Sequence, residues 1–520
     1  MSWKREVDEL KQRQTLALEM GGAERVARQH EAGRLTVRER INKLLDDQSF
    51  QEIGRIAGKA VYCDDGTLQA FSPANCVMGR GHIDGRPVVV SGDDFTIRGG
   101  SAEGSIWEKF KLSERMAFEY RLPLIRLIEG SGGGGSVRTI ESRGYANLPG
   151  GLGGQSGGLH LCAANLGAVP VVALALGSVA GLGAARLCFS HYSVMVKDTS
   201  AVFIAGPPVV ERLGEAVSKQ DLGGHVRQIA AGTVDDVATD EDDAFARTRR
   251  FLSYLPSSVH ELPVRMPSRD PATRGEEQLL SIVPRDRKQA YMMRKVIDGV
   301  ADIGSIFEMG AGFGRSVITA FARFDGWPVA LLAGNPLHFG GAWTAATARK
   351  IVRFIDLAET FHLPVVHLVD CPGLRVGTEA ETTGTLREGC RAISAISQST
   401  TPWCSVIIRN VFGVGGGAHQ PQNRLALRYA WPSARWGSLP LEGGIEAAYR
   451  AELNAAEDPS AELARIEARL DALQSPFHTA EAFGVEDIID PRDTRRLLCE
   501  FANLAAPLRM PGRAAFTMRP

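Results

Sequence analysis

The segment DGRPVVVSGDDFTIRGG, residues 84–100, returns later in the chain as DGWPVALLAGNPLHFGG, residues 325–341. In both copies an Asp-Gly pair and a proline precede a run of β-forming residues, and a glycine pair ends the segment. The same shift of 241 positions continues to the Leu-Pro pairs at 122–123 and 363–364. Chance matches among glycines would not hold one register through Asp, Pro and Leu as well. The chain therefore contains one fold twice.

The two copies stay aligned further downstream, after a loop that is shorter in the second copy. There the shift is 232 positions, and it pairs Pro170 with Pro402 and Gly181 with Gly413. Both glycines follow an apolar run, so each copy predicts a glycine turn directly after a buried strand.

Each copy predicts the same order of elements: a short strand, a glycine pair, a helix, a buried strand, a second glycine-rich segment, a helix, another buried strand and a third glycine turn. Repeated units of strand, turn and helix are typical of a layered α/β architecture. The predicted strands are 88–90, 124–128, 171–176, 329–332, 365–369 and 405–408, and the predicted helices are 106–120 and 345–361.

A chain of 520 residues exceeds the size at which one core stops growing, about 250–300 residues, so we expect two large domains. The first is predicted over residues 1–255 and includes a helical lead-in, 1–45. A proline-rich linker follows over 256–284, and the second domain occupies 285–520. Near its end, residues 461–473 predict an amphipathic helix that packs through its apolar stripe.

Composition excludes several classes of function. The 59 basic residues nearly cancel the 60 acidic residues, so no global field attracts nucleic acid or an anionic membrane. The eight cysteines form no CxxC pair, which predicts reduced, buried thiols in a cytoplasmic protein. No histidines have metal-ligand spacing, so no metal site is expected. The longest apolar run, 166–176, is about half of the roughly 20 residues that span a bilayer, so no membrane partner is expected.

The third glycine turn of each copy is the candidate site. The first turn reads Gly181-Leu182-Gly183, and the second reads GVGGG over residues 413–417. Small residues after a strand leave backbone N–H groups unobstructed, and paired N–H donors can stabilise a developing oxyanion. Turns that only close a strand have the same composition. The shared register favours the functional interpretation, with one oxyanion hole in each copy.

Other motifs are weak. The GxSxG pattern at 154–158 has no strand leading into it, which disfavours a serine hydrolase. The glycines at 413–415 match half of a dinucleotide fingerprint, but no acid follows about 20 residues later. No Walker A motif is present, so we do not expect ATP to bind this chain. His338 and His419 lie near the candidate turns, and both are interpreted as structural.

Six segments, in order along the chain, match one known family. They are AGRLTVRERI (32–41), FIAGP (203–207), DLGG (221–224), VDCPG with GT (369–373 and 377–378), AWPSA (430–434) and IDPR with TR (489–492 and 494–495). Together they resemble the carboxyltransferase (β) subunits of biotin-dependent acyl-CoA carboxylases, of the propionyl-CoA and methylcrotonyl-CoA carboxylase type. The resemblance covers nearly the full length.

The resemblance implies an α/β fold of two tandem crotonase-like (ClpP/crotonase) domains related by internal duplication. Gly181 and Leu182 would hold the thioester oxygen of an acyl-CoA, while Gly413, Val414 and Gly415 would hold the ureido oxygen of carboxybiotin. A carboxyl group would pass from carboxybiotin, presented by a separate carrier, to the α or γ carbon of the acyl-CoA through an enolate. The released biotin anion would take the substrate proton, so no side-chain base is required.

Further binding residues and partners are implied in the same way. Glycines implied to contact the acyl-CoA are Gly99, Gly100, Gly132, Gly133 and Gly417. Those implied to contact carboxybiotin are Gly340 and Gly341, with Val414 and Gly415. The implied partners are a biotin carboxylase with its biotin carrier subunit, which would use ATP, and other copies of this chain in a homo-oligomer, a hexamer. Its site would form between the amino-terminal half of one copy and the carboxy-terminal half of another.

The chain departs from the family in places that bear on its substrate. It has SGGGG at 131–135 where many relatives read SGGAR, and Leu182 and Val414 where a second glycine is usual. Gly417 lies where relatives often carry a larger residue that lines the acyl pocket. These departures predict a bulkier or unusual acyl chain. A decarboxylase or transcarboxylase of the same fold and a non-catalytic scaffold remain alternatives, although glycine at both paired turns argues against the scaffold.

Overall fold

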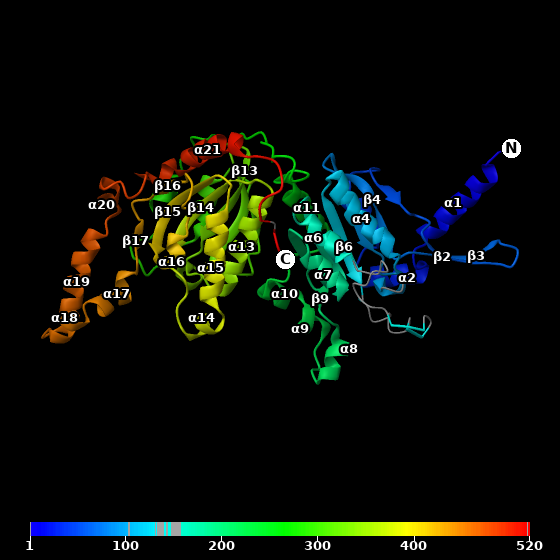
Figure 1. Ribbon diagram of the computed structural model, residues 1–520, viewed down its shortest axis with the longest axis horizontal. Helices are drawn as coiled ribbons and strands as arrows, with labels where there is room; N and C mark the ends of the chain where they lie inside the picture. Colours follow the sequence, from blue (N-terminus) through cyan, green and yellow to red (C-terminus); the bar gives the residue numbers. More distant parts are fainter. Residues whose placement is uncertain are drawn as a thin grey trace. The chain divides into compact units, whose positions relative to one another are not determined.

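The computed structural model describes residues 2–101, 104–130, 132, 140–141, 144–146, 158–516 and 518–520. The chain forms two compact units, one of residues Met1–Glu261 with Gly512–Pro520 and one of residues Leu262–Pro511 (Figure 1). The boundary between the two units along the chain therefore falls within the segment 256–284. The carboxy-terminal residues join the first unit because the N–H of Gly512 donates to the carbonyl of Val259 at 2.7 Å. The sequence analysis assigns them to the second domain instead.

The first unit begins with the expected helical lead-in: α1 (Lys4–Leu18), α2 (Ala23–Glu31) and α3 (Val37–Leu44). A capping box starts α3, because Thr36 accepts the N–H of Glu39 and the Glu39 carboxylate accepts the N–H of Thr36. Further along the chain, β2 (Gly58–Tyr62) and β3 (Leu68–Pro73) pair as a separate hairpin.

The main sheet of the first unit has the order β1-β4-β5-β6-β7-β8-β10, with β9 paired to β7. Pairing is antiparallel from β1 to β5 and parallel from β5 onward. The strands are β1 (Gln51–Ile53), β4 (Cys76–Ile83), β5 (Arg86–Asp93), β6 (Leu124–Gly130), β7 (Val171–Ala180), β8 (Tyr192–Val196), β9 (Ala201–Phe203) and β10 (Asp236–Ala238). Its helices are α4 (Trp107–Tyr120), α6 (Leu159–Asn165), α7 (Leu182–Cys188), α8 (Pro207–Val210), α9 (Lys219–Gly223), α10 (His225–Ala231) and α11 (Glu241–Ser253).

The second unit repeats this sheet with the order β11-β12-β13-β14-β15-β16-β18, and β17 pairs with β15. The strands are β11 (Phe307–Met309), β12 (Val317–Phe324), β13 (Trp327–Gly334), β14 (Val365–Cys371), β15 (Trp403–Phe412), β16 (Leu427–Ala430), β17 (Arg435–Gly437) and β18 (Asp487–Ile488). Its helices are α12 (Met293–Val300), α13 (Ala345–Thr360), α14 (Thr378–Thr382), α15 (Thr385–Gln398), α16 (Gly413–Gly417), α17 (Leu441–Ala448), α18 (Arg450–Ala455), α19 (Pro459–Leu473), α20 (Pro476–Glu481) and α21 (Thr494–Ala505).

Strand register confirms both sequence shifts. In β6–β7, Leu124 lies opposite Val171, and in β14–β15 Val365 lies opposite Trp403. From the first unit to the second, the residue number rises by 241 from Leu124 to Val365 and by 232 from Val171 to Trp403. The strand register also shifts after the fifth residue pair in both β6–β7 and β14–β15. The predicted strands and helices are confirmed, since each falls on an observed element.

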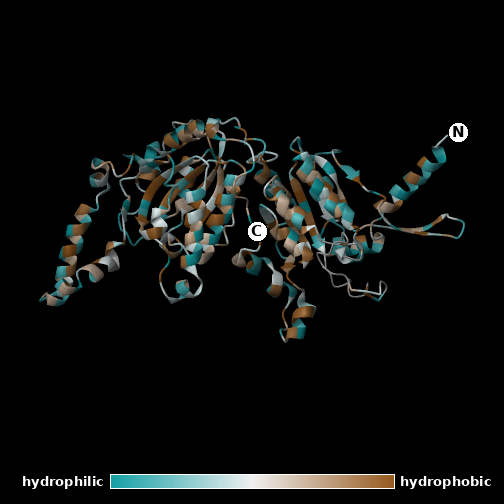
Figure 2. Cartoon of the chain, viewed as in Figure 1, coloured by the Kyte–Doolittle hydropathy of each residue, from teal (hydrophilic) through white to brown (hydrophobic). Residues whose placement is uncertain are grey.

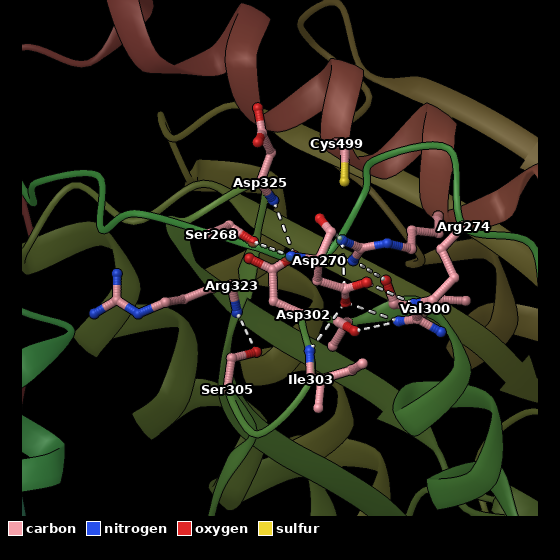
Figure 3. Close-up of polar contacts among 12 residues, drawn as sticks. Ser268, Asp270, Arg274, Val300, Asp302, Ile303, Ser305, Arg323, Asp325 and Cys499 are labelled. Carbon is pink, nitrogen blue, oxygen red and sulfur yellow. Dashed lines mark hydrogen bonds and ion pairs between the residues drawn. The ribbon is translucent and has the colours of Figure 1, made fainter.

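A carboxylate from outside the turn caps the Asp-Gly turn in each unit. Asp46 accepts the N–H groups of residues 84 and 85 at 3.0 and 2.8 Å, and Asp302 accepts those of residues 325 and 326 at 3.1 and 2.7 Å. Figure 3 shows Asp302 with Asp270 among the neighbouring polar side chains of the second unit. The repeat therefore extends to a cap that lies outside the aligned segment.

The core lies in the parallel strands. Every residue of β6, β14 and β15 is buried, and Figure 2 shows hydrophobic residues concentrated along the strands. On the first sheet α4 packs on β4, β5 and β6, and on the second α13 packs on β12 and β13. Such all-buried runs are typical of parallel sheets with helices on both faces.

All eight cysteines lie in the described residues and are free. Five of them are buried and Cys188 is partly buried, but Cys63 and Cys390 are exposed, so the expectation of buried thiols is wrong at these two positions. Cys63 directly follows β2, and Cys390 lies in α15. Among the described residues, no helix is both long and apolar enough to cross a bilayer.

Candidate active site

In the glycine turn of the first unit, both the N–H and the carbonyl of Gly181 are hydrogen-bonded. Gly181 has φ 58° and ψ −119°, a conformation open to glycine, and it caps α7. Its N–H donates to the carbonyl of Phe203 at 3.3 Å, and its carbonyl accepts the N–H of Ala185 at 3.0 Å. The N–H groups of Leu182 and Gly183 follow in the first turn of the helix, where no intrahelical acceptor exists. They are the backbone donors that this turn can offer to a ligand.

The turn of the second unit is packed more tightly. Gly413 has φ 59°, and Val414 beside it is 67% exposed. A Cβ atom on Gly415 would lie 3.0 Å from the carbonyl carbon of Gly373, and one on Gly416 would lie 2.8 Å from that of Val411. Glycine is therefore required at residue 416, and residue 415 has little room for a side chain where the turn lies against the end of β14. A Cβ atom on Gly417 would meet no atom within 4 Å.

The glycine pairs lie at the same edge of their sheets as the turns. Gly100 and Gly341 both have positive φ, 63° and 89°. A Cβ atom on Gly100 would clash with the carbonyl oxygen of Glu129, and one on Gly341 would lie 2.5 Å from that of Asp370. Each pair therefore packs against the carboxyl end of β6 or β14. Ligands of open α/β sheets bind at this edge.

The other predicted contacts divide between described and undescribed residues. Gly99 and Gly340 precede these packed glycines and also have positive φ, 61° and 62°. Gly132 lies beside the end of β7, because a Cβ atom on it would be 3.1 Å from the carbonyl oxygen of Ala180. Gly133 and Ser156 of the GxSxG pattern lie outside the described residues. Within each unit, the described glycines thus gather at one strand edge.

The acid that ends β6 is held by a buried network. Glu129 accepts hydrogen bonds from Arg34 at 2.7 Å, Arg40 at 2.5 Å and Gln29 at 2.8 Å, and Arg40 also pairs with Glu241 at 2.8 Å. Burial raises the pKa of Glu129, while Arg40 and Arg34 oppose that rise. These contacts tie the lead-in helices to the strand end, so Glu129 has a structural role.

Asp370, at the corresponding end of β14, has other partners. Its carboxylate accepts from the Tyr291 hydroxyl at 2.9 Å, from Arg409 Nε at 3.2 Å and from the Asn410 amide at 2.7 Å. Burial raises the pKa of Asp370 against the opposing effect of Arg409, and burial also raises the pKa of Tyr291 well above its usual value. Both strand-end acids are therefore fully engaged within their own units.

His419 is a structural residue, as expected. Its Nδ1 lies 2.9 Å from the carbonyl oxygen of Gly416. Its own carbonyl accepts from Trp403 Nε1 at 3.0 Å and Ser405 Oγ at 2.9 Å. Burial lowers the pKa of His419, which keeps the ring neutral. The histidine fastens the segment after the second glycine turn to β15.

One feature of the first unit is absent from the sequence predictions. A pocket of about 210 Å³ beside Gly99 is lined by four arginines, Arg25, Arg28, Arg34 and Arg98. These residues come from α2, from the segment before α3 and from the loop after β5. The available signal is the basic segment AERVARQHEAGR, but sequence alone does not place it against residue 98. No group of three His, Cys, Asp or Glu residues within the described part of the chain could hold a metal ion.

Comparison with known proteins gives matches over nearly the whole chain. The family described as carboxyl transferase domain matches residues 28–511. The carboxyltransferase subunit of propionyl-CoA carboxylase from Haloferax mediterranei is 33% identical over 518 residues, 98% of this chain and 96% of that protein. Methylmalonyl-CoA decarboxylase subunit alpha from Veillonella parvula is 31% identical over 479 residues, 91% of each chain.

Among solved structures, a crystal structure of transcarboxylase 12S superposes with a TM-score of 0.87 at 31% identity and covers 100% of this chain and 98% of that one. It is described as a hexamer assembly with methylmalonyl-coenzyme A and methylmalonic acid bound. The match confirms the expected fold of two crotonase-like domains. It includes both copies of the repeat and therefore both glycine turns.

Proposed function

The chain belongs to the carboxyl transferase domain family and is a carboxyltransferase, and we propose that it moves a carboxyl group between carboxybiotin and an acyl-CoA. The observation that carries this proposal is the glycine turn that occurs twice, at the same register of two like sheets. Carboxyl transfer needs two carbonyl-type oxygens to be stabilised, one on each reactant. Two copies of one backbone oxyanion hole meet that need.

In the first unit, we assign the thioester oxygen of the acyl-CoA to the N–H groups of Leu182 and Gly183. The Gly181 N–H is already bonded to Phe203, so the role of Gly181 is to set the backbone direction through its positive φ. Negative charge that develops on the thioester oxygen, as the enolate forms, would be stabilised by these fixed donors. Removing one such donor in known enzymes costs about 10²–10³ in kcat.

In the second unit, we assign the ureido oxygen of carboxybiotin to the N–H groups of Val414 and Gly415. Carboxybiotin, presented by a separate carrier protein, supplies the activated carboxyl group. Uncharged N–H donors suit the neutral ureido oxygen, and the tight packing of Gly415 and Gly416 fixes their direction. Gly340 and Gly341 lie at the same strand edge, in the segment after β13, and would contact the biotin ring.

For the acyl chain, Gly417 supports a substrate larger than acetyl-CoA. The open space around this glycine would remain available to the acyl group, where a larger side chain would fill it. Transfer to the α carbon, rather than to the γ carbon, is proposed because the relatives compared act on propionyl-CoA or methylmalonyl-CoA. The methylmalonyl-CoA decarboxylase relative supports the reverse reaction as a second candidate function.

We further propose that the chain works as a hexamer with a biotin carboxylase and biotin carrier partner. A large apolar side chain is exposed close to each turn, with Ile204 after β9 at 96% and Val414 at 67%. Exposed apolar residues of this size mark surfaces that another chain covers. The hexamer of transcarboxylase 12S supports the same assembly. Light scattering on the purified chain tests it, and a monomer at micromolar concentration would contradict it.

The reaction is tested without the partner by running it in reverse. The purified chain is mixed with free biotin and either methylmalonyl-CoA or malonyl-CoA, and the loss of the carboxyl group from the thioester is measured. We expect biotin-dependent decarboxylation that is faster for methylmalonyl-CoA. No biotin-dependent loss from either thioester, by a chain that is shown to be folded and oligomeric, would contradict the proposal. Loss that does not require biotin would contradict the role assigned to the turn of the second unit.

A further inference from the structure

We propose that Arg186 binds a carboxylate group of the acyl-CoA through two N–H groups that the protein leaves unpaired. Arg186 lies on α7, the helix that begins at the first glycine turn, and its side chain is only 8% exposed. Its Nε and Nη2 atoms have no hydrogen-bond partner in the part of the chain that the structure describes. The inference rests on the proposed function for the identity of the ligand. It adds a side chain that discriminates among acyl-CoA substrates.

The rest of the Arg186 side chain is held in place by its neighbours. Its Nη1 lies 3.2 and 3.4 Å from the carboxylate oxygens of Asp93, at the end of β5, and its guanidinium carbon lies 3.9 Å from the centre of the Phe110 ring on α4. The Arg186 carbonyl accepts from Arg126 Nη1 at 3.0 Å, and Arg126 is itself paired with Glu114 at 2.7 Å. The two free N–H groups therefore have a set direction, which lowers the entropy lost when a ligand binds.

The unpaired edge of the guanidinium matches a carboxylate. Nε and Nη2 lie on one edge of the planar group, and their N–H bonds point the same way. An arginine edge of this kind donates two parallel hydrogen bonds to the two oxygens of a carboxylate. A buried, charged donor without a partner destabilises the protein, so we expect a ligand to complete it. A hydrocarbon acyl chain would leave both N–H groups unpaired.

The charges around Arg186 also favour an anion. Within the described residues, Asp93 is the acid paired with Arg186, while Glu114 is neutralised by its own arginine. A second basic group, Lys109, lies nearby on α4. Burial raises the pKa of the Cys76 thiol, and both Lys109 and Arg186 oppose that rise, whereas Asp93 adds to it. Two basic side chains are thus set against one acid at this place.

Arg186 lies close to the backbone donors of the first glycine turn. It follows Leu182, whose N–H is assigned to the thioester oxygen, by four residues. Residues four apart lie on the same side of a helix, roughly 5 Å apart along its axis, and their side chains lean toward its amino-terminal end. A short acyl group could therefore reach the guanidinium. Its carboxylate would be either the transferred carboxyl group on the α carbon or a carboxylate at the far end of the acyl chain.

The second unit has neither charged group at the corresponding positions. The shift of 232 positions places Ala418 where the first unit has Arg186, and the shift of 241 places Gly334 where it has Asp93. The ureido oxygen assigned to the second unit is neutral and needs no guanidinium. The carboxylate site thus belongs to the unit assigned to the acyl-CoA.

The test is calorimetric binding of three thioesters to the full chain. Methylmalonyl-CoA has a carboxylate on the α carbon, glutaryl-CoA has one at the far end of the acyl chain, and butyryl-CoA has none. Arg186→Gln removes the charge and the parallel pair of donors. The matched control, Arg115→Gln, loses the same charge from an exposed position of α4. In Arg186→Gln we expect Kd to rise at least about tenfold for a thioester with a carboxylate and to stay unchanged for butyryl-CoA. The control should match the unmodified chain with all three ligands.

The pattern of losses identifies the carboxylate. Loss for methylmalonyl-CoA alone assigns Arg186 to the transferred carboxyl group, loss for glutaryl-CoA alone assigns it to a dicarboxylic acyl-CoA, and loss for both supports a site that accepts either carboxylate. Arg186→Lys keeps the charge without the paired donors, so its affinity should be intermediate, and it takes the place of Arg186→Gln if that variant does not fold.

Unchanged affinity in the Arg186 variants, or an equal loss for all three thioesters, would overturn the inference and leave the proposed function untouched. Binding needs neither the carrier nor turnover, so a selective loss supports the inference even if no carboxyl group is transferred. An unmodified chain that binds none of the three thioesters would overturn the inference together with the proposed function.

Discussion

The two units share one strand register but hold the acid at the same strand end in different ways. In the first unit Glu129 is bonded to Arg34 and Arg40, which come from the lead-in. In the second unit Asp370 is bonded to Arg409, on the adjacent strand β15. The residue of the first unit that corresponds to Arg409 is Gly177, and a Cβ atom there would clash with the carboxylate of Glu129.

This difference shows how a duplicated fold can diverge while its strands stay aligned. A longer acid and a glycine on the neighbouring strand leave room for an arginine from outside the repeat. The first unit thereby depends on residues 34–40, and Arg34 among them also lines the basic pocket. The second unit meets the same need within its own sheet.

The largest expected effect follows from removing Arg40. Arg40→Met leaves both Glu129 and Glu241 without their shared buried partner, and breaking a buried ion pair in this way costs about 3–5 kcal/mol. Arg409→Met should cost less, because Arg409 is paired with one carboxylate, that of Asp370, whereas Arg40 is paired with two. Urea unfolding measures both losses, and hydrogen exchange on β6 and β14 shows which unit is weakened. Equal losses would contradict the difference drawn between the units.

The second-largest effect should follow from removing a backbone N–H donor in either glycine turn. Leu182→Pro removes one N–H at the first helical position, where proline fits the backbone, and should lower kcat about 10²–10³-fold. Val414→Pro should do the same for the turn of the second unit. Leu182→Ala and Val414→Ala keep the N–H groups and serve as controls. Light scattering should show the same oligomer for all four variants, and near-normal kcat in either proline variant would remove that turn from the mechanism.

Much of this architecture could be predicted from the sequence, because the pattern of apolar residues, glycine and proline is local. The helix predicted at 106–120 is observed at Trp107–Tyr120, and the one at 345–361 is observed at Ala345–Thr360. Those of the predicted glycines that the structure describes are found at the carboxyl edges of their sheets. Each of these features depends on neighbours within a few positions in the chain.

What could not be predicted depends on contacts between distant residues. Glu129 stands at the end of an apolar run in the sequence, but its partners Arg40 and Arg34 lie 89 and 95 positions away. The bond between the Gly181 N–H and Phe203 was hidden for the same reason, and it shifts the proposed donor from Gly181 to Leu182 and Gly183. Pairings of this kind become visible only when the sheet is assembled.

The two units should also differ in how their stability depends on pH, and the expected difference is of moderate size. His367, on β14, corresponds to Arg126 on β6, which is paired with Glu114 at 2.7 Å. Burial lowers the pKa of His367 to about 3. The unfolded chain, with a His pKa near 6.5, binds this proton first as the pH falls, so stability is complete above about pH 6.5 and is lost toward pH 3.

From pH 7 to pH 5 this histidine should cost the second unit about 2 kcal/mol. His367→Gln keeps an N–H donor for the carbonyl of His419 but does not titrate, so it should lose less stability over the same interval. Urea unfolding of both chains at the two pH values measures the difference. An identical pH dependence would show that His367 is not the residue responsible.

The smallest expected effect on stability comes from Gly417, and it separates packing from specificity within one turn. Gly417→Ala adds a methyl group into open space, so the free energy of unfolding should change by less than about 0.5 kcal/mol. Gly416→Ala, one residue earlier, would place its Cβ atom 2.8 Å from the backbone of Val411 and should be clearly destabilising. If Gly417 borders the acyl chain, Gly417→Phe should raise KM for the longest thioester of a series and leave KM for acetyl-CoA unchanged. A uniform change across the series would place the acyl chain elsewhere, and the open space at Gly417 would then be a feature of the turn alone.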